Sequence, residues 1–221
     1  MENLNPSVVR LSGVLLISGA VTFWSMIIAA IVYQMRTGSL PFKDWASVPA
    51  RDFYESIAVH PGWWRWVNRC FALGIVMTAF GLTALKLALT DAGDRVFAEL
   101  GWTSFLIGAL LWLVLFTFNG SMAIWAAEVT PSQGSVLVTF EAWPKWMERI
   151  VLIYMILAYT SLAFYGIALL NTGLLASWAG WMALSVGLAG AASIILWGSG
   201  FAIPLLIHIV PFLIGILLLL K

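Results

Sequence analysis

Six long apolar runs dominate the pattern of hydrophobic and polar positions along the chain. They cover about residues 11–33, 67–89, 101–127, 147–170, 177–197 and 201–220, and charged residues, prolines, glycines or other polar residues separate them. An α-helix needs about 20 apolar residues to cross the roughly 30 Å hydrocarbon core of a bilayer. The pattern therefore predicts six transmembrane helices. Strands of a membrane barrel would instead alternate apolar and polar residues over about ten positions.

Two polar connections, residues 34–66 and 128–146, are long enough to have structure of their own. An even number of predicted helices separates them, so we expect both large loops on the same side of the membrane. There they would meet and form a small cap, with both ends of the chain on the opposite side. The distribution of Lys and Arg favours a cytoplasmic position for these loops.

The first connection contains a short amphipathic stretch followed by a cluster of tryptophans. Residues 50–57 lie between Pro49 and Pro61, and Phe53 and Ile57 would share one face of a helix there. We expect that face to lie against the membrane surface. Trp63, Trp64 and Trp66 are then predicted at headgroup depth, the depth that tryptophan prefers.

The last two runs are separated only by Gly198-Ser199-Gly200, which predicts an antiparallel helical hairpin. Within the fifth run, small residues recur at Ala183, Gly187 and Ala191. Small residues let two helix backbones approach closely in a membrane. This spacing therefore predicts a close helix–helix contact.

Composition supports lipid as the main solvent of the chain. Apolar residues make up 62% of the 221 positions and charged residues only 10%, whereas a soluble domain carries about 25% charged residues. We expect a single all-α domain over residues 1–221, a polytopic transmembrane helical bundle with one interfacial loop region. The expected location is a bacterial inner (plasma) membrane, with the lipid bilayer and other membrane subunits as partners. The net charge of +1 gives no basis for binding nucleic acid.

His208 is the strongest candidate for a functional residue, because it lies near the middle of the last apolar run. An ionisable side chain at that depth is costly and is by default a functional hypothesis. Imidazole there could bind a haem or chlorin, hydrogen-bond a quinone or relay a proton. The alternative is a neutral histidine bonded to a neighbouring hydroxyl or free carbonyl. His60 is the only other histidine and lies in the first loop, so bis-histidine haem ligation is not expected.

The possible polar neighbours of His208 are Asn119 in the third run and the hydroxyls of Tyr154, Ser161 and Tyr165 in the fourth. We expect His208 to face the bundle interior and at least one of its ring nitrogens to bond one of these groups. With His208 they form the candidate cofactor-binding set. Ordinary interhelical hydrogen bonding is the alternative interpretation of Asn119 and of the three hydroxyls.

No metal-ligand cluster, nucleophile–base pair or phosphate loop can be assembled from the sequence. The single cysteine, Cys70, excludes an intrachain disulfide and a multi-cysteine metal site. No catalytic residues and no metal site are therefore expected, no particular cofactor is indicated, and an enzyme is not the expected class.

The last third of the chain combines a short turn, a Trp-rich helix start and a final run with an internal proline. The residues are Tyr165-Gly166, Gly173-Leu174-Leu175, Trp178-Ala179-Gly180-Trp181, Pro211, Gly215 and the terminal Lys221. These features resemble the DUF4386-like family of small bacterial membrane proteins of unknown function. The resemblance implies six helices and carries no assigned chemistry.

Two functions fit the sequence. The first is a structural or accessory subunit of a larger membrane assembly, for example one that carries pigments or redox cofactors. The scarcity of interior polar groups favours this subunit role. The second is a binding protein or carrier for a lipophilic molecule such as a quinone, lipid or pigment, with His208 and the tyrosines as polar contacts. The few interior polar groups slightly favour the first.

Overall fold

The computed structural model describes residues 5–37, 48–133, 135–198 and 204–221. These residues are almost entirely helical, and no strand occurs among them. Their helices are α1 (Pro6–Thr37), α2 (Ala50–Val59), α3 (Pro61–Asp91), α4 (Val96–Asn119), α5 (Met122–Gln133), α6 (Val138–Glu141), α7 (Trp143–Thr172), α8 (Ser177–Trp197) and α9 (Pro204–Leu219).

Five helical stretches are long and apolar enough to cross a membrane. They are Pro6–Thr37, Pro61–Asp91, Val96–Thr130, Val138–Thr172 and Ser177–Trp197. They match the first five predicted runs, and α8 has the predicted bounds. The all-α class is confirmed, and five such helices fit an integral, multi-pass membrane protein.

The sixth predicted run is represented by α9, which is shorter. Its 16 residues extend over about 24 Å at a rise of about 1.5 Å per residue. Residues 201–203 of the predicted run, and Ser199 and Gly200 of the predicted turn, lie outside the described residues. The structure therefore gives five long spans and one short apolar helix.

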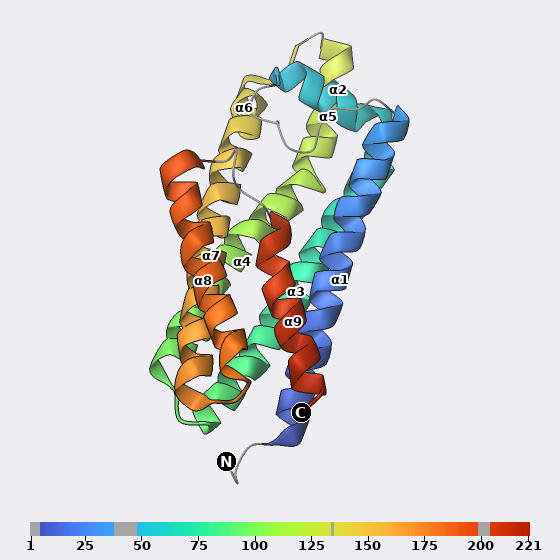
Figure 1. Cartoon of the computed structure of the whole chain (residues 1–221). Helices are drawn as coiled ribbons and strands as arrows, with labels where there is room; N and C mark the ends of the chain where they lie inside the picture. The colour runs from blue at the N-terminus through green and yellow to red at the C-terminus, as the bar shows by residue number, and fades with distance from the viewer. Residues whose placement is uncertain (1–4, 38–47, 134, 199–203) are drawn as a thin grey trace.

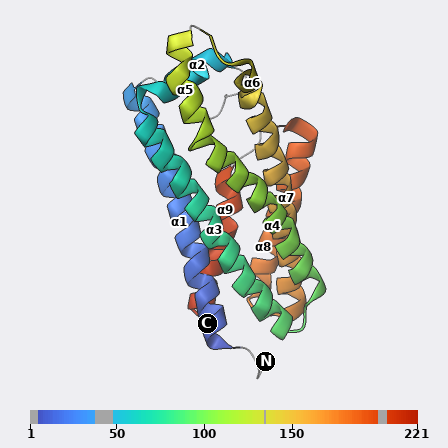
Figure 2. The ribbon, with the colours of Figure 1, turned by 180° about the vertical axis from the view of Figure 1, so that it is seen from behind.

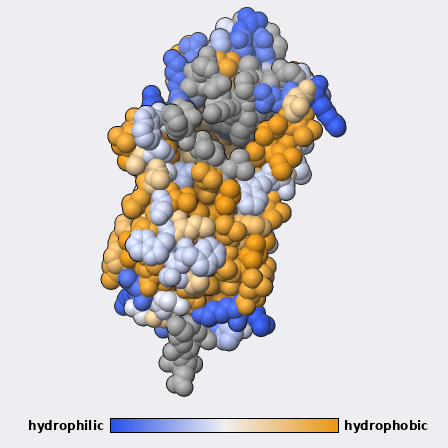
Figure 3. Space-filling model, viewed as in Figure 1, coloured by the Kyte–Doolittle hydropathy of each residue, from blue (hydrophilic) through white to orange (hydrophobic). Residues whose placement is uncertain are grey.

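The long helices run alternately up and down between two ends of the molecule. Figures 1 and 2 show both chain termini at one end, and α2, α5 and α6 at the other. α1 packs closely on α3 and on α9, α4 lies between α3 and α7, and α7 packs closely on α8. Hydrophobic residues cover the middle of the face in Figure 3, with hydrophilic residues at both ends.

Glycines bring the backbones of paired helices into direct contact. Between α1 and α3, a Cβ built on Gly19 would lie 2.8 Å from the Thr78 nitrogen, and the Ser12 hydroxyl donates to the Gly81 carbonyl over 2.9 Å. Between α7 and α8, a Cβ on Gly187 would lie 2.6 Å from the Tyr159 carbonyl oxygen. The close contact predicted around Gly187 is present, and its partner is α7.

α9 runs antiparallel to α8, as the short turn predicted, but it does not pack closely on α8. Its close partner is α1, where a Cβ on Gly215 would lie 2.9 Å from the Gly13 carbonyl oxygen. By contrast, α9 contacts α7 and α8 only lightly. The reason is that a short connection fixes chain direction, whereas small residues fix which helix backbones can touch.

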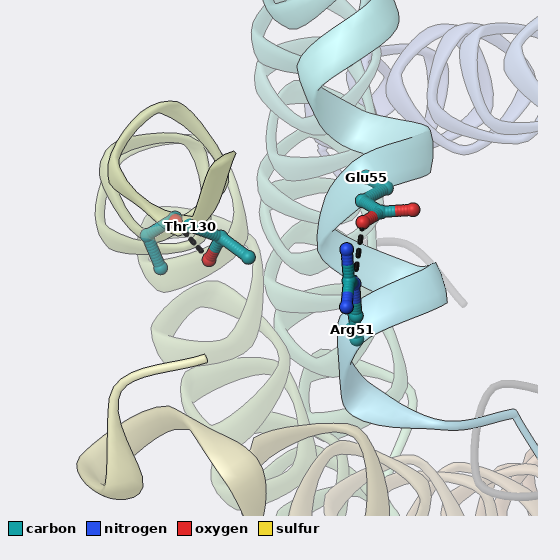
Figure 4. A network of polar contacts seen from close by, with 4 residues as sticks. Arg51, Glu55 and Thr130 are labelled. Atoms are coloured by element: carbon teal, nitrogen blue, oxygen red, sulfur yellow. Dashed lines mark hydrogen bonds and ion pairs between the residues drawn. The ribbon is translucent and has the colours of Figure 1, made fainter. Parts of the chain in front are cut away.

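The two polar connections meet at the end of the bundle that lies away from the termini. α2 packs on α5 and also touches α6, and Figure 4 shows α2 beside the helix that carries Thr130. The Tyr54 hydroxyl donates to the Phe140 carbonyl over 3.0 Å. We call α2, α5 and α6 the cap.

The apolar face of α2 packs on protein, which corrects the expectation that it rests on the membrane surface. Phe53, Tyr54 and Ile57 are each at most 1% exposed. On the outer face, Arg51 and Glu55 form an exposed ion pair of 2.7 Å. The aromatic and aliphatic residues of α5, α6 and α3 cover this face more completely than a headgroup layer would, because protein interiors are close-packed.

Polar contacts also close the terminal end of the bundle. The buried Asp94 carboxylate accepts the backbone N–H of Phe97 at the start of α4 over 2.9 Å, and the Asn171 amide at the end of α7 over 2.7 Å. Lys86 of α3 pairs with Glu99 of α4. These contacts satisfy helix-end donors and tie α3, α4 and α7 together.

Tryptophans near both ends of α8 indicate the depth of the hydrocarbon layer. Trp178 and Trp197 are both exposed. Their separation along the helix is about 28 Å, close to the hydrocarbon thickness of roughly 30 Å. Indole prefers the membrane interface, so α8 has the length and end residues of a complete span.

Candidate functional site

His208 lies near the start of α9 and is almost completely buried, with 1% of its surface exposed. Its ring stacks on Phe23 of α1, with 3.9 Å between ring centroids and an interplanar angle of 28°. Among the residues that the structure describes, neither ring nitrogen has a hydrogen-bond partner. The expected interior position is found, and the expected bond to a tyrosine, serine or asparagine is not.

The stacked pair belongs to a larger group of rings in the bundle interior. Phe23 contacts Phe71 at 5.1 Å and Trp112 at 6.4 Å between centroids. Trp112 contacts Phe116 at 5.0 Å and Tyr154 at 4.1 Å. We call these rings the central aromatic cluster: Phe23, Phe71, Trp112, Phe116, Tyr154 and His208. Helices α1, α3, α4, α7 and α9 all contribute to it.

The polar atoms of the central aromatic cluster lack partners. Of eight such buried side-chain atoms in the described residues, four belong to it: Trp112 Nε1, the Tyr154 hydroxyl and both His208 nitrogens. A buried donor or acceptor left unpaired costs about 1–3 kcal/mol, and folded proteins pair the great majority of them. Their concentration in one cluster indicates a place where a further group completes the hydrogen bonds.

A glycine on α4 explains why Tyr154 lies so close to Trp112. A Cβ on Gly108 would lie 3.2 Å from the Tyr154 ring, so α7 approaches α4 closely at this level. Trp112 is one turn further along α4 and meets the same ring. The small residue therefore positions both polar rings.

The other predicted site residues lie away from His208. The Tyr165 hydroxyl donates to the Leu82 carbonyl over 3.0 Å. The Asn119 side chain accepts from Trp143 Nε1 over 2.8 Å and donates to Met147 Sδ over 3.0 Å. The Ser161 hydroxyl is buried and has no partner in the part of the chain that the structure describes. Only His208 and Tyr154 of the predicted set belong to the cluster.

Sequence reasoning missed Phe23 and Trp112. Phe23 carries no polar group, so nothing distinguished it from the other apolar residues of its run. Trp112 did carry a signal, because it lies near the middle of an apolar run, whereas tryptophan prefers the membrane interface and a partner for its N–H. A mid-membrane indole is a polar group at a costly depth, as the imidazole of His208 is.

The central aromatic cluster is electrically neutral. No acidic or basic residue lies within four sequence positions of Phe23, Trp112, Phe116, Tyr154 or His208, and Arg69, two positions from Phe71, is exposed. No group of three potential metal ligands occurs in the residues that the structure describes. The arrangement can donate and accept hydrogen bonds and can stack on a flat ring. An ion would find no opposite charge there.

No protein-family model, curated protein or solved structure matches the chain. The resemblance to the DUF4386-like family therefore stays a prediction.

Proposed function

We propose that the protein is an integral membrane binding protein for a lipophilic small molecule, and that the central aromatic cluster is its binding site. One observation carries this proposal. Four polar atoms on three helices are buried together without partners in an apolar interior. This observation reverses the slight preference for an accessory subunit, which rested on the scarcity of interior polar groups.

A bound molecule with a polar end would satisfy these atoms without bringing charge into the membrane. The polar end would accept or donate the missing hydrogen bonds, and the remainder would lie among apolar side chains. Sites for small molecules commonly combine aromatic walls with a few converging polar groups. The cluster has this composition.

The helix packing also provides a route from the lipid. α9 is held mainly by α1 and contacts α7 and α8 only lightly. A lipophilic molecule that enters between α9 and α7 would therefore separate a light contact and leave the glycine-mediated ones intact. We propose in addition that α9, with the residues before it, forms a sixth membrane crossing.

The proposal is tested by identifying molecules that stay with the protein. The protein is purified from its native membranes in mild detergent, and its organic extract is analysed by mass spectrometry and absorption. We expect a lipophilic molecule in near-stoichiometric amount in the wild type. Its amount should fall at least fivefold in His208→Leu and Trp112→Phe, because each loses a hydrogen bond.

Trp178→Phe is the matched control, because Trp178 is exposed on α8 and belongs to no part of the cluster. It should retain the wild-type amount. A wild-type extract with only bulk lipids in their membrane proportions contradicts the proposal. So does equal retention in all four proteins.

The second candidate is the accessory subunit predicted from the sequence. Exposed small residues on the outer side of α8, Ser185, Ala189 and Ala192, favour it because such residues accept a neighbouring helix in membranes. The same purification separates the two: a stoichiometric partner chain supports the subunit, and a lone chain with a bound lipophile supports the binding protein.

A further inference from the structure

The hydrogen-bonding inventory of the central aromatic cluster limits what it can hold. An indole N–H is a donor only, a phenol both donates and accepts, and a neutral imidazole has one donor and one acceptor nitrogen. Trp112, Tyr154 and His208 therefore offer three donors. The complementary ligand carries at least two acceptor atoms.

The absence of charge around the cluster limits the ligand further. A carboxylate or phosphate would have to be desolvated with no described acidic or basic residue within four sequence positions of the three donor residues Trp112, Tyr154 and His208, at a cost of several kcal/mol. Fatty acids and phospholipid headgroups are therefore disfavoured. Acceptors that remain neutral at all ordinary pH values, such as ketone oxygens, fit.

The shape of the cluster favours a flat ring. The donors are carried by aromatic rings that contact one another from α9 through Phe23 to α4 and α7. Aromatic side chains stack on planar rings in offset or edge-to-face arrangements. The polar groups of this series are His208, which contacts Phe23, and the Trp112–Tyr154 pair, of which Trp112 contacts Phe23 as well.

We propose that the central aromatic cluster binds the ring of a quinone, with one carbonyl oxygen toward Trp112 and Tyr154 and the other toward His208. The two carbonyls of a para-quinone lie at opposite ends of a planar neutral ring, which matches donors placed on opposite helices. The acceptor nitrogen of His208 would accept a hydrogen bond from the O–H of the reduced quinol form. The isoprenoid tail would leave between α9 and α7 toward the lipid. This inference rests on the proposed function and names the ligand of the same site.

The experiment uses the full chain in nanodiscs of synthetic phospholipid, with a decyl-substituted benzoquinone as the probe. Its Kd is measured by equilibrium partitioning against empty nanodiscs, and isotope-edited infrared spectra report its carbonyl stretches. We expect saturable one-to-one binding and a downshift of both stretches relative to the probe in empty nanodiscs. A simple N-alkane of matched length should not compete.

Three variants test the individual contacts. Tyr154→Phe, Trp112→Phe and His208→Leu should each weaken binding about fivefold, the factor that corresponds to one neutral hydrogen bond. His208→Leu should return one carbonyl stretch toward its free frequency, and Trp112→Phe the other. Tyr165→Phe is the matched control on the same helix as Tyr154, since its hydroxyl already donates to the Leu82 carbonyl, and it should bind as the wild type does.

Two results overturn the inference: probe uptake that does not saturate, and equal affinities and spectra in the cluster variants and Tyr165→Phe. Circular dichroism and size-exclusion profiles confirm that the compared variants are folded. If His208→Leu does not fold, Trp112→Phe provides the comparison with the wild type. If the benzoquinone probe does not bind saturably, but another molecule is retained from native membranes and lost in His208→Leu, the proposed function stands and only the ligand class is wrong. If nothing is retained, both fail.

Discussion

The α1–α3 contact offers a direct test of the packing that positions the central aromatic cluster. In Gly19→Ala, the added Cβ would lie 2.8 Å from the Thr78 nitrogen and 2.9 Å from the Gly74 carbonyl oxygen. Both are backbone atoms, which cannot rotate away. Ordinary van der Waals contact begins at 3.4 Å, so the backbones must separate by about 0.6 Å. Phe23, one turn further along α1, would move with it.

Two opposing terms set the size of the effect. Overpacking a close contact costs about 1–3 kcal/mol, and alanine gains about 1 kcal/mol over glycine in helix propensity. The expected net destabilisation relative to the wild type is about 0–2 kcal/mol. Gly62→Ala in α3 is the control, because no atom lies within 4 Å of its added Cβ and only the propensity gain remains.

Equilibrium unfolding in detergent micelles with increasing SDS, followed by far-UV circular dichroism, measures the difference. Gly19→Ala should unfold at lower SDS than the wild type, and Gly62→Ala at the same or higher SDS. Gly19→Ala should also lose affinity for any ligand of the cluster. A Gly19→Ala protein as stable as Gly62→Ala would refute the close approach of α1 and α3.

Four further predictions concern the two ends of the bundle. Tyr54→Phe should destabilise the cap by about 1 kcal/mol by removing the bond to α6, measured as faster hydrogen exchange in α2. Burial raises the pKa of the Tyr54 phenol above its usual value of 10. The cap is therefore fully stable below about pH 10 and loses stability as the pH rises further. In an alkaline titration followed by absorbance, one late-titrating phenolate should be missing from Tyr54→Phe. Asp94→Ala should lower stability by about 2 kcal/mol, because it removes a helix cap and an interhelical bond; an unchanged SDS midpoint would contradict this. Single cysteines at Asn5 and Lys221 should react with an impermeant reagent from one side of the membrane and a cysteine at Glu55 from the other; labelling of Asn5 and Lys221 from opposite sides would exclude an even number of crossings.

The sequence predicted the helices because length and polarity are local properties. An apolar run long enough to cross a bilayer has its backbone hydrogen bonds satisfied only as a helix. Charged residues and glycines end such runs, so the approximate positions of the helices followed as well, although α3 begins at Pro61 and not at residue 67. The short helix between Pro49 and Pro61 was visible because prolines bound it.

The sequence could not predict which faces of the helices meet. In a membrane, the residues toward lipid and the residues toward protein are equally apolar, so periodicity does not distinguish them. Gly19 and Gly74 are 55 residues apart, and only the folded chain shows that they touch. The same holds for α9, which packs on α1 although its nearest neighbour along the chain is α8.

Part of the candidate site could likewise be predicted from the sequence, and part of it only from the structure. His208 and Tyr154 could be selected from the sequence because polar groups at mid-membrane depth are costly and therefore conspicuous. Their surroundings could not, since Tyr165 and Asn119 looked equally suitable and bond elsewhere in the structure. By itself the sequence determined which stretches of the chain form long apolar helices and approximately where they lie. The tertiary structure alone decided which polar atoms meet a partner, because that depends on contacts between helices far apart in the chain.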